Sequence, residues 1–279
     1  MKVLITGGKG QLGSAMRQRL EELQIPCIAV DKEEFDLTKQ DETVAYIKSY
    51  MPDVVVHCAA YTAVDKAESE KELCYDINVN GTRNIVLACR ETGAKLIYIS
   101  TDYIFAGIGD MPHETDEKPD PINYYGETKY LGEVAVKEWP KSFILRTSWV
   151  FGQNGNNFIN TMLRLAGEGK KIRVVNDQTG SPTYTVDLAR LIADMLETES
   201  YGTYHAANEG LCTWYEYANY IFECKGLKPD IVPVTSAEYI TPARRPQNSR
   251  LSRSALDAAG FARLPHWRDA VQRYLNNIK

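Results

Sequence analysis

The chain has 279 residues, of which 44% are hydrophobic and 25% charged, and a formal net charge of −5. This is an ordinary globular composition, long enough for one large domain or two closely joined ones. The negative balance argues against general binding to nucleic acid or to an acidic membrane surface, because both need a basic face.

Over the first 150 residues, short apolar runs alternate with helix-like stretches. The runs are rich in Val, Ile and Leu and do not alternate with polar residues, which favours parallel strands covered on both faces. Strand–helix alternation predicts an α/β fold, a doubly wound parallel sheet of the Rossmann type. We expect strands at 3–6, 27–31, 54–59, 96–100 and 143–147, and helices at 12–23, 41–50, 76–92 and 125–138.

After about residue 150 the alternation loosens. Polar and Pro-rich connections at 179–183 and 241–248 favour irregular, ligand-facing segments. We therefore expect a dinucleotide-binding domain at 1–150 and a smaller C-terminal substrate-binding part at 151–279. The two are interleaved, because 185–197 could return to pack on the sheet. Expected helices lie at 158–168, 185–197 and 214–224, and expected strands at 172–175, 203–206 and 231–234.

Glycines follow the first predicted strand at Gly7, Gly10 and Gly13. A tight turn needs glycine, a pyrophosphate must approach the backbone closely, and a helix N-terminus favours negative charge. Asp31 then ends the second predicted strand, which completes the context expected of a dinucleotide site. A turn that uses glycine only for steric reasons is the alternative.

Asp31 suits the adenosine ribose, because its carboxylate can accept hydrogen bonds from both hydroxyls and would repel a 2′-phosphate. It thus favours NADH over NADPH, although Lys32 beside it softens the repulsion and NADPH stays a candidate. Asp36 could hold the adenine amino group while Leu37 lines the ring. The alternatives are a solvated strand end for Asp31 and a helix cap for Asp36.

Small residues follow the third predicted strand at Ala59 and Ala60, and Tyr61 comes next. Small side chains at a strand end let the backbone reach the ribose and pyrophosphate, although close sheet–helix packing would also select them. Further on, Asn80 is a candidate for hydrogen bonding to the active-site backbone, or a helix-surface amide.

Tyr125 and Lys129 stand four residues apart in a predicted helix, on the same helix face. An ammonium beside a phenol should lower the tyrosine pKa from about 10. Thr101 leaves the fourth predicted strand at the edge where open α/β sheets bind ligands. We expect Tyr125 to protonate a carbonyl oxygen during hydride transfer, with Thr101 hydrogen-bonded to that oxygen and Lys129 contacting the nicotinamide ribose. By itself, Tyr-x-x-x-Lys is more often a surface pair.

Three later residues are candidates for binding a ligand. Trp149 could stack on the apolar face of a pyranose, or it could pack in the core. Arg244 and Arg245 could clamp a diphosphate, or they could form a solvated basic loop.

The six cysteines include no Cys-x-x-Cys pair, and the four histidines are scattered. This spacing predicts no metal site and a reducing compartment. No apolar stretch reaches the length of about 18 residues that spans a membrane, and 3–5 is too short for a signal-peptide core. We therefore expect a cytoplasmic protein.

Several segments together resemble the extended short-chain dehydrogenases/reductases and, more narrowly, the dTDP-4-dehydrorhamnose reductase family. These segments are Gly-Gly-Lys-Gly-Gln-Leu-Gly, Cys-Ala-Ala-Tyr-Thr-Ala-Val-Asp-Lys-Ala-Glu, Asn-Val-Asn-Gly-Thr, Ser-Thr-Asp-Tyr-Ile-Phe, Tyr-Gly-Glu-Thr-Lys, Arg-Thr-Ser-Trp-Val-Phe-Gly and Ala-Arg-Arg-Pro-Gln-Asn-Ser-Arg-Leu.

The resemblance implies reduction of the 4-keto group of dTDP-4-dehydro-L-rhamnose to dTDP-L-rhamnose by NADH or NADPH. It makes Tyr125 the proton donor, with Lys129 and Thr101 as partners, and it implies that Thr101, Asp102 and Trp149 contact the sugar. The residues that it implies for cofactor binding are Gly10, Gln11, Leu12, Asp31, Asp36, Leu37, Ala59, Ala60 and Tyr61.

Two positions depart from patterns of the wider family. Related sugar-nucleotide dehydratases have an acidic pair directly after the threonine, whereas Asp102 is followed by Tyr103, which argues against a dehydratase. Some family reductases dimerise through magnesium held partly by a glutamate two positions after the last glycine of the motif. That position is Ala15 here, so metal-linked dimerisation is not expected.

Two other functions remain open. The regulatory subunit of methionine adenosyltransferase resembles the same family and serves as a nucleotide-binding partner protein. A reductase of another nucleotide-linked 4-keto deoxysugar is the second alternative. The sequence is compatible with a monomer or a homodimer.

Overall fold

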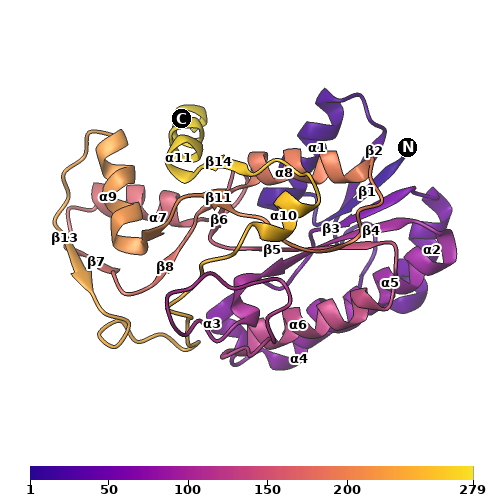
Figure 1. Ribbon diagram of the computed structural model, residues 1–279, viewed down its shortest axis with the longest axis horizontal. Helices are drawn as coiled ribbons and strands as arrows, with labels where there is room; N and C mark the ends of the chain where they lie inside the picture. The colour runs from indigo at the N-terminus through magenta and orange to yellow at the C-terminus, as the bar shows by residue number, and fades with distance from the viewer. Residues whose placement is uncertain (279) are drawn as a thin grey trace.

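A six-stranded parallel sheet organises residues 1–278, the part of the chain that this computed structural model describes (Figure 1). The strand order is β10-β5-β4-β3-β1-β2, so successive strands lead outward from β1 in opposite directions. Such a reversal opens a crevice at the carboxyl ends of the strands, where ligands bind. The predicted Rossmann-type fold is confirmed. The strands are β1 Val3–Thr6, β2 Cys27–Val30, β3 Val54–His57, β4 Lys95–Thr101, β5 Ser142–Thr147 and β10 Gly202–His205.

Helices cover both faces of this sheet. One face carries α1 (Gln11–Glu22) and α8 (Thr185–Leu196), and the other carries α2 (Gln40–Tyr50), α5 (Gly81–Thr92) and α6 (Tyr124–Lys137) (Figure 1). Within β1, Val3 and Ile5 pack under α1 and α8, whereas Leu4 packs under the opposite layer. The central strands are therefore covered on both faces, which explains why they consist largely of apolar runs.

A second core lies toward the C-terminal end, between α7 (Phe158–Gly167), α9 (Trp214–Cys224) and α11 (Trp267–Asn277). The chain after residue 150 contributes to both cores, because α8 packs against α1 and β10 pairs with β5. The remaining elements are short: α3 Val64–Ala67, α4 Lys71–Tyr75, α10 Ser254–Ala258, β6 Val150–Phe151, β7 Ile172–Val175, β8 Thr179–Gly180, β9 Thr183–Tyr184, β11 Asn208–Glu209, β12 Cys212–Thr213, β13 Ile231–Val234 and β14 Leu264–His266.

Two regions differ from the sequence-based expectations. The helix expected at 76–92 starts as a π-helical turn at Asp76–Asn80, which continues α4 into α5. The helix α11 was not expected, although Trp267, Val271 and Tyr274 recur at helical spacing and are buried. No helix of the described part is long and apolar enough to cross a membrane.

Candidate active site

The glycine loop between β1 and α1 is fitted tightly against the neighbouring strand end. Gly7 adopts a left-handed φ of 68°, and a Cβ on it would come within 2.8 Å of the Ala59 nitrogen. A Cβ on Gly13 would overlap the Gly7 carbonyl. Gly10 caps α1 without a side-chain hydrogen bond, and the first turn, which contains Gln11, has no acidic residue. The positive end of α1 is thus left for an anion, as a pyrophosphate requires.

Asp31 stands beside this loop, as expected for a ribose ligand. Its Oδ2 accepts the Lys9 amide N–H at 2.8 Å, and partial burial raises the pKa of its carboxyl. Lys9 directs its ammonium to Glu33, with 3.1 Å between Nζ and Oε1. The carboxylate of Asp31 and the ammonium of Lys9 therefore both lie next to the glycine loop.

Asp36 and Leu37 make contacts within the protein that stabilise its fold. Oδ1 of Asp36 accepts the amide N–H of Thr38 at 3.0 Å and its hydroxyl at 2.7 Å, and these bonds lower the pKa of the Asp36 carboxyl. Asp36 thus stabilises the turn before α2, in line with its alternative capping role. Leu37 packs so closely on α5 that a Cβ on Gly81 would overlap it.

The backbone at Ala59 and Tyr61 is held by two buried side chains. The Thr6 hydroxyl accepts the Ala59 N–H at 3.1 Å. Oδ1 of Asn78 accepts the Tyr61 N–H at 2.8 Å, and its Nδ2 donates to the Tyr61 carbonyl at 3.2 Å. The strand-end backbone around Ala60 is therefore fixed next to the glycine loop.

Asn78, and not Asn80, makes these bonds to the active-site backbone. Asn80 donates to Asp76 at 2.7 Å and accepts from Arg83 at 3.2 Å, as a helix-surface amide would. The π-helical turn decides between the two residues, because it rotates Asn78 into the interior, where 1% of it is exposed. The motif Asn-Val-Asn contains both asparagines, so the sequence could point to the motif but not to the residue.

Tyr125 lies near Thr101 where β4 ends against α6, and Lys129 follows one turn later on the same helix. Asn123 caps α6 by accepting the Gly126 N–H at 2.8 Å. A Cβ on Gly126 would overlap the Tyr103 carbonyl, so glycine lets α6 approach the turn after β4. The rings of Tyr125 and Tyr103 meet edge to face, with 6.0 Å between centroids, and the Thr101 side chain lies near enough to Tyr125 to influence its pKa.

The electrostatics of this pair differ from the sequence-based expectation. Burial, followed by the nearby Asp102 carboxylate, raises the pKa of Tyr125 above its ordinary value. Burial also lowers the pKa of Lys129 to about 7, and its Nζ lies 4.1 Å from the centroid of the Tyr98 ring. The expected lowering of the Tyr125 pKa was wrong, because burial dominates and the Asp102 carboxylate raises the pKa further. A raised pKa keeps Tyr125 protonated at neutral pH, as a proton donor must be.

A buried ion pair that the sequence analysis missed holds α6 in place. Glu133 and Arg146 are 0% and 1% exposed at their side chains, and two N–H groups of the guanidinium donate to the carboxylate at 2.9 Å each. The Ser100 hydroxyl donates to the same carboxylate at 2.6 Å. These bonds tie α6 to β4 and β5, and they fix the rotation of the helix that carries Tyr125. The arginine inside the apolar run of β5 was the feature of the sequence that could have indicated this ion pair.

Trp149 lies at the entrance to the second core and next to the strand-end residues. Its backbone has a left-handed φ of 50°, and its ring stacks on Trp214 with 3.7 Å between centroids. A Cβ on Gly180 would come within 2.8 Å of the Trp149 ring and 3.0 Å of Ser249. The side chain of Ser249 in turn lies near Asp102 and acts to lower the pKa of its carboxyl. Gly180 and Ser249 therefore lie between Trp149 and Asp102, although the ring of Trp214 covers one face of the Trp149 indole.

The two arginines proposed as a diphosphate clamp have different surroundings. Arg245 donates to Oδ2 of Asp65 at 2.7 Å, which fastens the segment 241–248 to the loop after β3. This ion pair occupies the Arg245 guanidinium and argues against Arg245 as part of a diphosphate clamp. Arg244 is exposed, and its carbonyl accepts a hydrogen bond from Asn123 at 2.8 Å.

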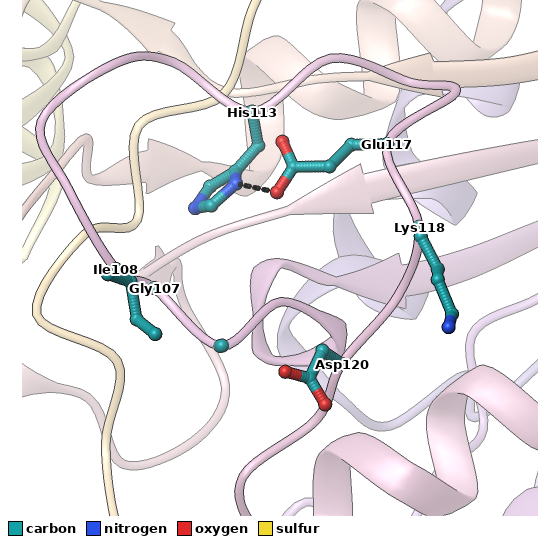
Figure 2. A pocket seen from close by; sticks show the side chains of 7 residues that line it. Gly107, Ile108, His113, Glu117, Lys118 and Asp120 are labelled. Carbon is teal, nitrogen blue, oxygen red and sulfur yellow. Dashed lines mark hydrogen bonds and ion pairs between the residues drawn. The ribbon is translucent and has the colours of Figure 1, made fainter.

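The loop after β4, which hydrogen-bonds the backbone of the segment 241–252, lines a hollow of about 410 Å³ (Figure 2). His113 is held within it by hydrogen bonds to Glu117 at 2.8 Å and to the Asn248 carbonyl at 3.2 Å. Of the described residues, those that line it are Ala106, Gly107, Ile108, His113, Glu117, Lys118 and Asp120. The hollow is therefore separate from Tyr125 and Lys129.

Within residues 1–278, no group of three or more His, Cys, Asp or Glu side chains could hold a metal ion. Ala15, at the position that holds a magnesium ligand in some related reductases, packs against the core beneath α1.

Comparisons with known proteins agree with this geometry. The family model described as "RmlD substrate binding domain" matches residues 1–279. The spore coat polysaccharide biosynthesis protein SpsK of Bacillus subtilis is 42% identical over 98% of this chain and 96% of its own. The dTDP-4-dehydrorhamnose reductase of Escherichia coli is 40% identical over 100% of this chain and 98% of its own.

A crystal structure of dTDP-4-dehydrorhamnose reductase from Bacillus anthracis, in complex with NADP, superposes with a TM-score of 0.97. It is 42% identical, and the match covers 99% of both chains. Since both the sequence and the fold match over full length, this chain belongs to the RmlD family, whose members include dTDP-4-dehydrorhamnose reductases.

Proposed function

We propose that this protein reduces the 4-keto group of dTDP-4-dehydro-L-rhamnose to dTDP-L-rhamnose with NADPH or NADH. The observation that carries the proposal is that Tyr125 lies near Thr101 where β4 ends, with Lys129 one turn further along the same helix. The glycine loop follows β1 of the same parallel sheet, so it lies at the same carboxyl edge. This is the edge of an open α/β sheet where a cofactor and a carbonyl substrate can meet. Full-length relatives that carry this activity support the same conclusion.

The residues around the glycine loop form a site that fits the cofactor. Gly7, Gly10 and Gly13, with the N–H groups of Gln11 and Leu12 at the start of α1, would hold the pyrophosphate. Asp31 would bind the adenosine ribose, with the ammonium of Lys9 near enough to favour a 2′-phosphate. When bound, the dihydronicotinamide supplies the hydride. The Bacillus anthracis relative with NADP supports use of NADPH.

Side chains of the protein would donate the proton to the carbonyl oxygen. Tyr125, protonated because its pKa is raised, donates to the carbonyl oxygen as negative charge develops there. Lys129 provides a buried cation one helical turn away, which stabilises the phenolate left behind. Thr101 holds the carbonyl oxygen in line with Tyr125. Trp149 would orient the sugar, and Asp102 lies beside Thr101.

The test uses enzymatically prepared dTDP-4-dehydro-L-rhamnose with NADPH or NADH, and NMR identifies the product. Tyr125→Phe should lower turnover on the order of 10²–10⁴-fold and leave cofactor binding intact. Tyr124→Phe is the matched control, because the neighbouring ring lies beside Lys71 at 5.1 Å and should not affect turnover. Near-normal turnover by Tyr125→Phe, where chemistry limits the rate, would remove Tyr125 from the mechanism.

A different 4-keto deoxysugar is the second candidate, and the 42% identity to a spore coat polysaccharide protein favours considering it. Stereochemical analysis of the product separates the two substrates. If no nucleotide-linked 4-keto sugar is reduced by the wild-type protein, the proposed function is wrong and a non-catalytic nucleotide-binding role is favoured.

A further inference from the structure

The Thr101 hydroxyl has little hydrogen-bonding capacity left for a substrate. A threonine hydroxyl has one proton to donate and two lone pairs that accept. Oγ1 of Thr101 already accepts the Tyr103 N–H at 3.2 Å, as the cap of the turn after β4. It also lies 3.0 Å from Oδ1 of Asp102. What Thr101 can offer a carbonyl oxygen therefore depends on its bond to Asp102.

The direction of that bond depends on whether Asp102 carries a proton. An ionised carboxylate only accepts, so Thr101 must give it the single hydroxyl proton and cannot donate to a carbonyl oxygen. A protonated Asp102 can donate to Thr101 instead. Both lone pairs of Thr101 are then occupied, and its own proton is released toward the substrate. Tyr125 can no longer donate to Thr101 either, so both protons can point at the carbonyl oxygen.

Burial of Asp102 raises the proton affinity of its carboxyl. The residue is 3% exposed, and its Oδ2 makes no hydrogen bond of normal geometry to a described residue. Burial raises its pKa to about 6, while the hydroxyls of Ser249 and Thr101 and the imidazole of His113 act in the opposite direction. The phenols of Tyr103 and Tyr125 face it as well. A substrate that excludes more water would favour the neutral acid further.

We propose that Asp102 is a positioning residue that is protonated when the carbonyl is reduced, and that it donates to Thr101 so that the Thr101 proton meets the carbonyl oxygen. The inference rests on the proposed function. No bond to Asp102 forms or breaks. The hydride adds to the carbonyl carbon, the Tyr125 proton adds to the oxygen, and Asp102 keeps its own proton.

The first experiment measures kcat and KM across the acidic to neutral range for the wild type, Asp102→Asn and Asp102→Ala. Deuterated cofactor checks that hydride transfer limits the rate. The wild-type kcat should fall as pH rises above about 6, because Asp102 ionises. An amide can donate at any pH, so Asp102→Asn should keep kcat within about 3-fold and lose the fall that begins near pH 6, while a fall that begins near pH 7, where Lys129 loses its proton, should remain. Asp102→Ala should lose about 10-fold or more in kcat, since the oxyanion donor is no longer oriented.

A double-mutant cycle tests whether Asp102 acts through Thr101. If it does, Asp102→Ala in a Thr101→Val background should change kcat by less than about 2-fold. Equal effects of Asp102→Ala in both backgrounds would overturn the inference, and so would an Asp102→Asn variant whose KM alone rises with an unchanged pH profile. Either result would make Asp102 an independent contact to the sugar.

Melting temperatures and NADPH affinity establish that each variant is folded. A wild-type protein that reduces no 4-keto sugar would overturn the proposed function and this inference with it, whereas turnover with additive mutations would overturn the inference alone.

Discussion

Replacing Lys129 by methionine should stabilise the folded protein at neutral pH while it abolishes turnover. Lys129 is 3% exposed, and its pKa falls from 10.5 to about 7 on folding. Such a change makes the charged form about 4 kcal/mol less favourable at pH 7 in the folded state than in the unfolded one. The cation–π contact with Tyr98 offsets about 0.5–2 kcal/mol of this cost of burying the charge. Methionine has a similar length and no charge, so a net gain of about 2–3 kcal/mol is expected.

The pH dependence has a definite sign. Because the pKa of Lys129 is lower in the folded state, the unfolded state binds more protons between about pH 7 and pH 10.5, and wild-type stability rises with pH in that window. The advantage of Lys129→Met should therefore shrink by about 3 kcal/mol between pH 7 and about pH 9.5.

Urea unfolding of the ligand-free protein at several pH values measures both effects. Lys137→Met is the matched control, because Lys137 is an exposed lysine in the last turn of the same helix. Its replacement should change stability by less than about 1 kcal/mol. A Lys129→Met variant that is no more stable than the wild type at pH 7, or whose advantage does not change with pH, would refute a buried and disfavoured ammonium.

Three further predictions concern the ligands. Asp31→Ala should shift the ratio of catalytic efficiencies toward NADPH by about 10-fold or more, because a repelling charge is removed; an unchanged ratio would show that Asp31 is not at the ribose. Trp149→Ala should raise KM for the sugar nucleotide and, through the lost stack on Trp214, cost about 1–3 kcal/mol in urea unfolding. A stability loss with unchanged catalytic efficiency would leave only the packing role. EDTA should change neither the initial rate nor the sedimentation mass; loss restored by magnesium would contradict the expectation drawn from Ala15.

Much of the fold was predictable because its signals are local. The strands β1 and β3 are buried on both faces, so their sequences are unbroken apolar runs wherever the rest of the chain lies. The glycine loop needs Gly7 and Gly13 for backbone approach, and the spacing of Tyr125 and Lys129 places them on one helix face. Each of these features depends on residues within a few positions of one another.

The sequence alone thus determined the sheet, the glycine loop and the chemical types of the residues proposed as catalytic. Only the tertiary structure decided that Asn78 faces inward, that Arg245 is held by Asp65 and that Lys129 is buried with a lowered pKa. Asp65 and Arg245 are 180 positions apart in the chain. Burial, charge pairing and proton affinity depend on atoms that folding brings together from distant segments, and no local pattern carries that information.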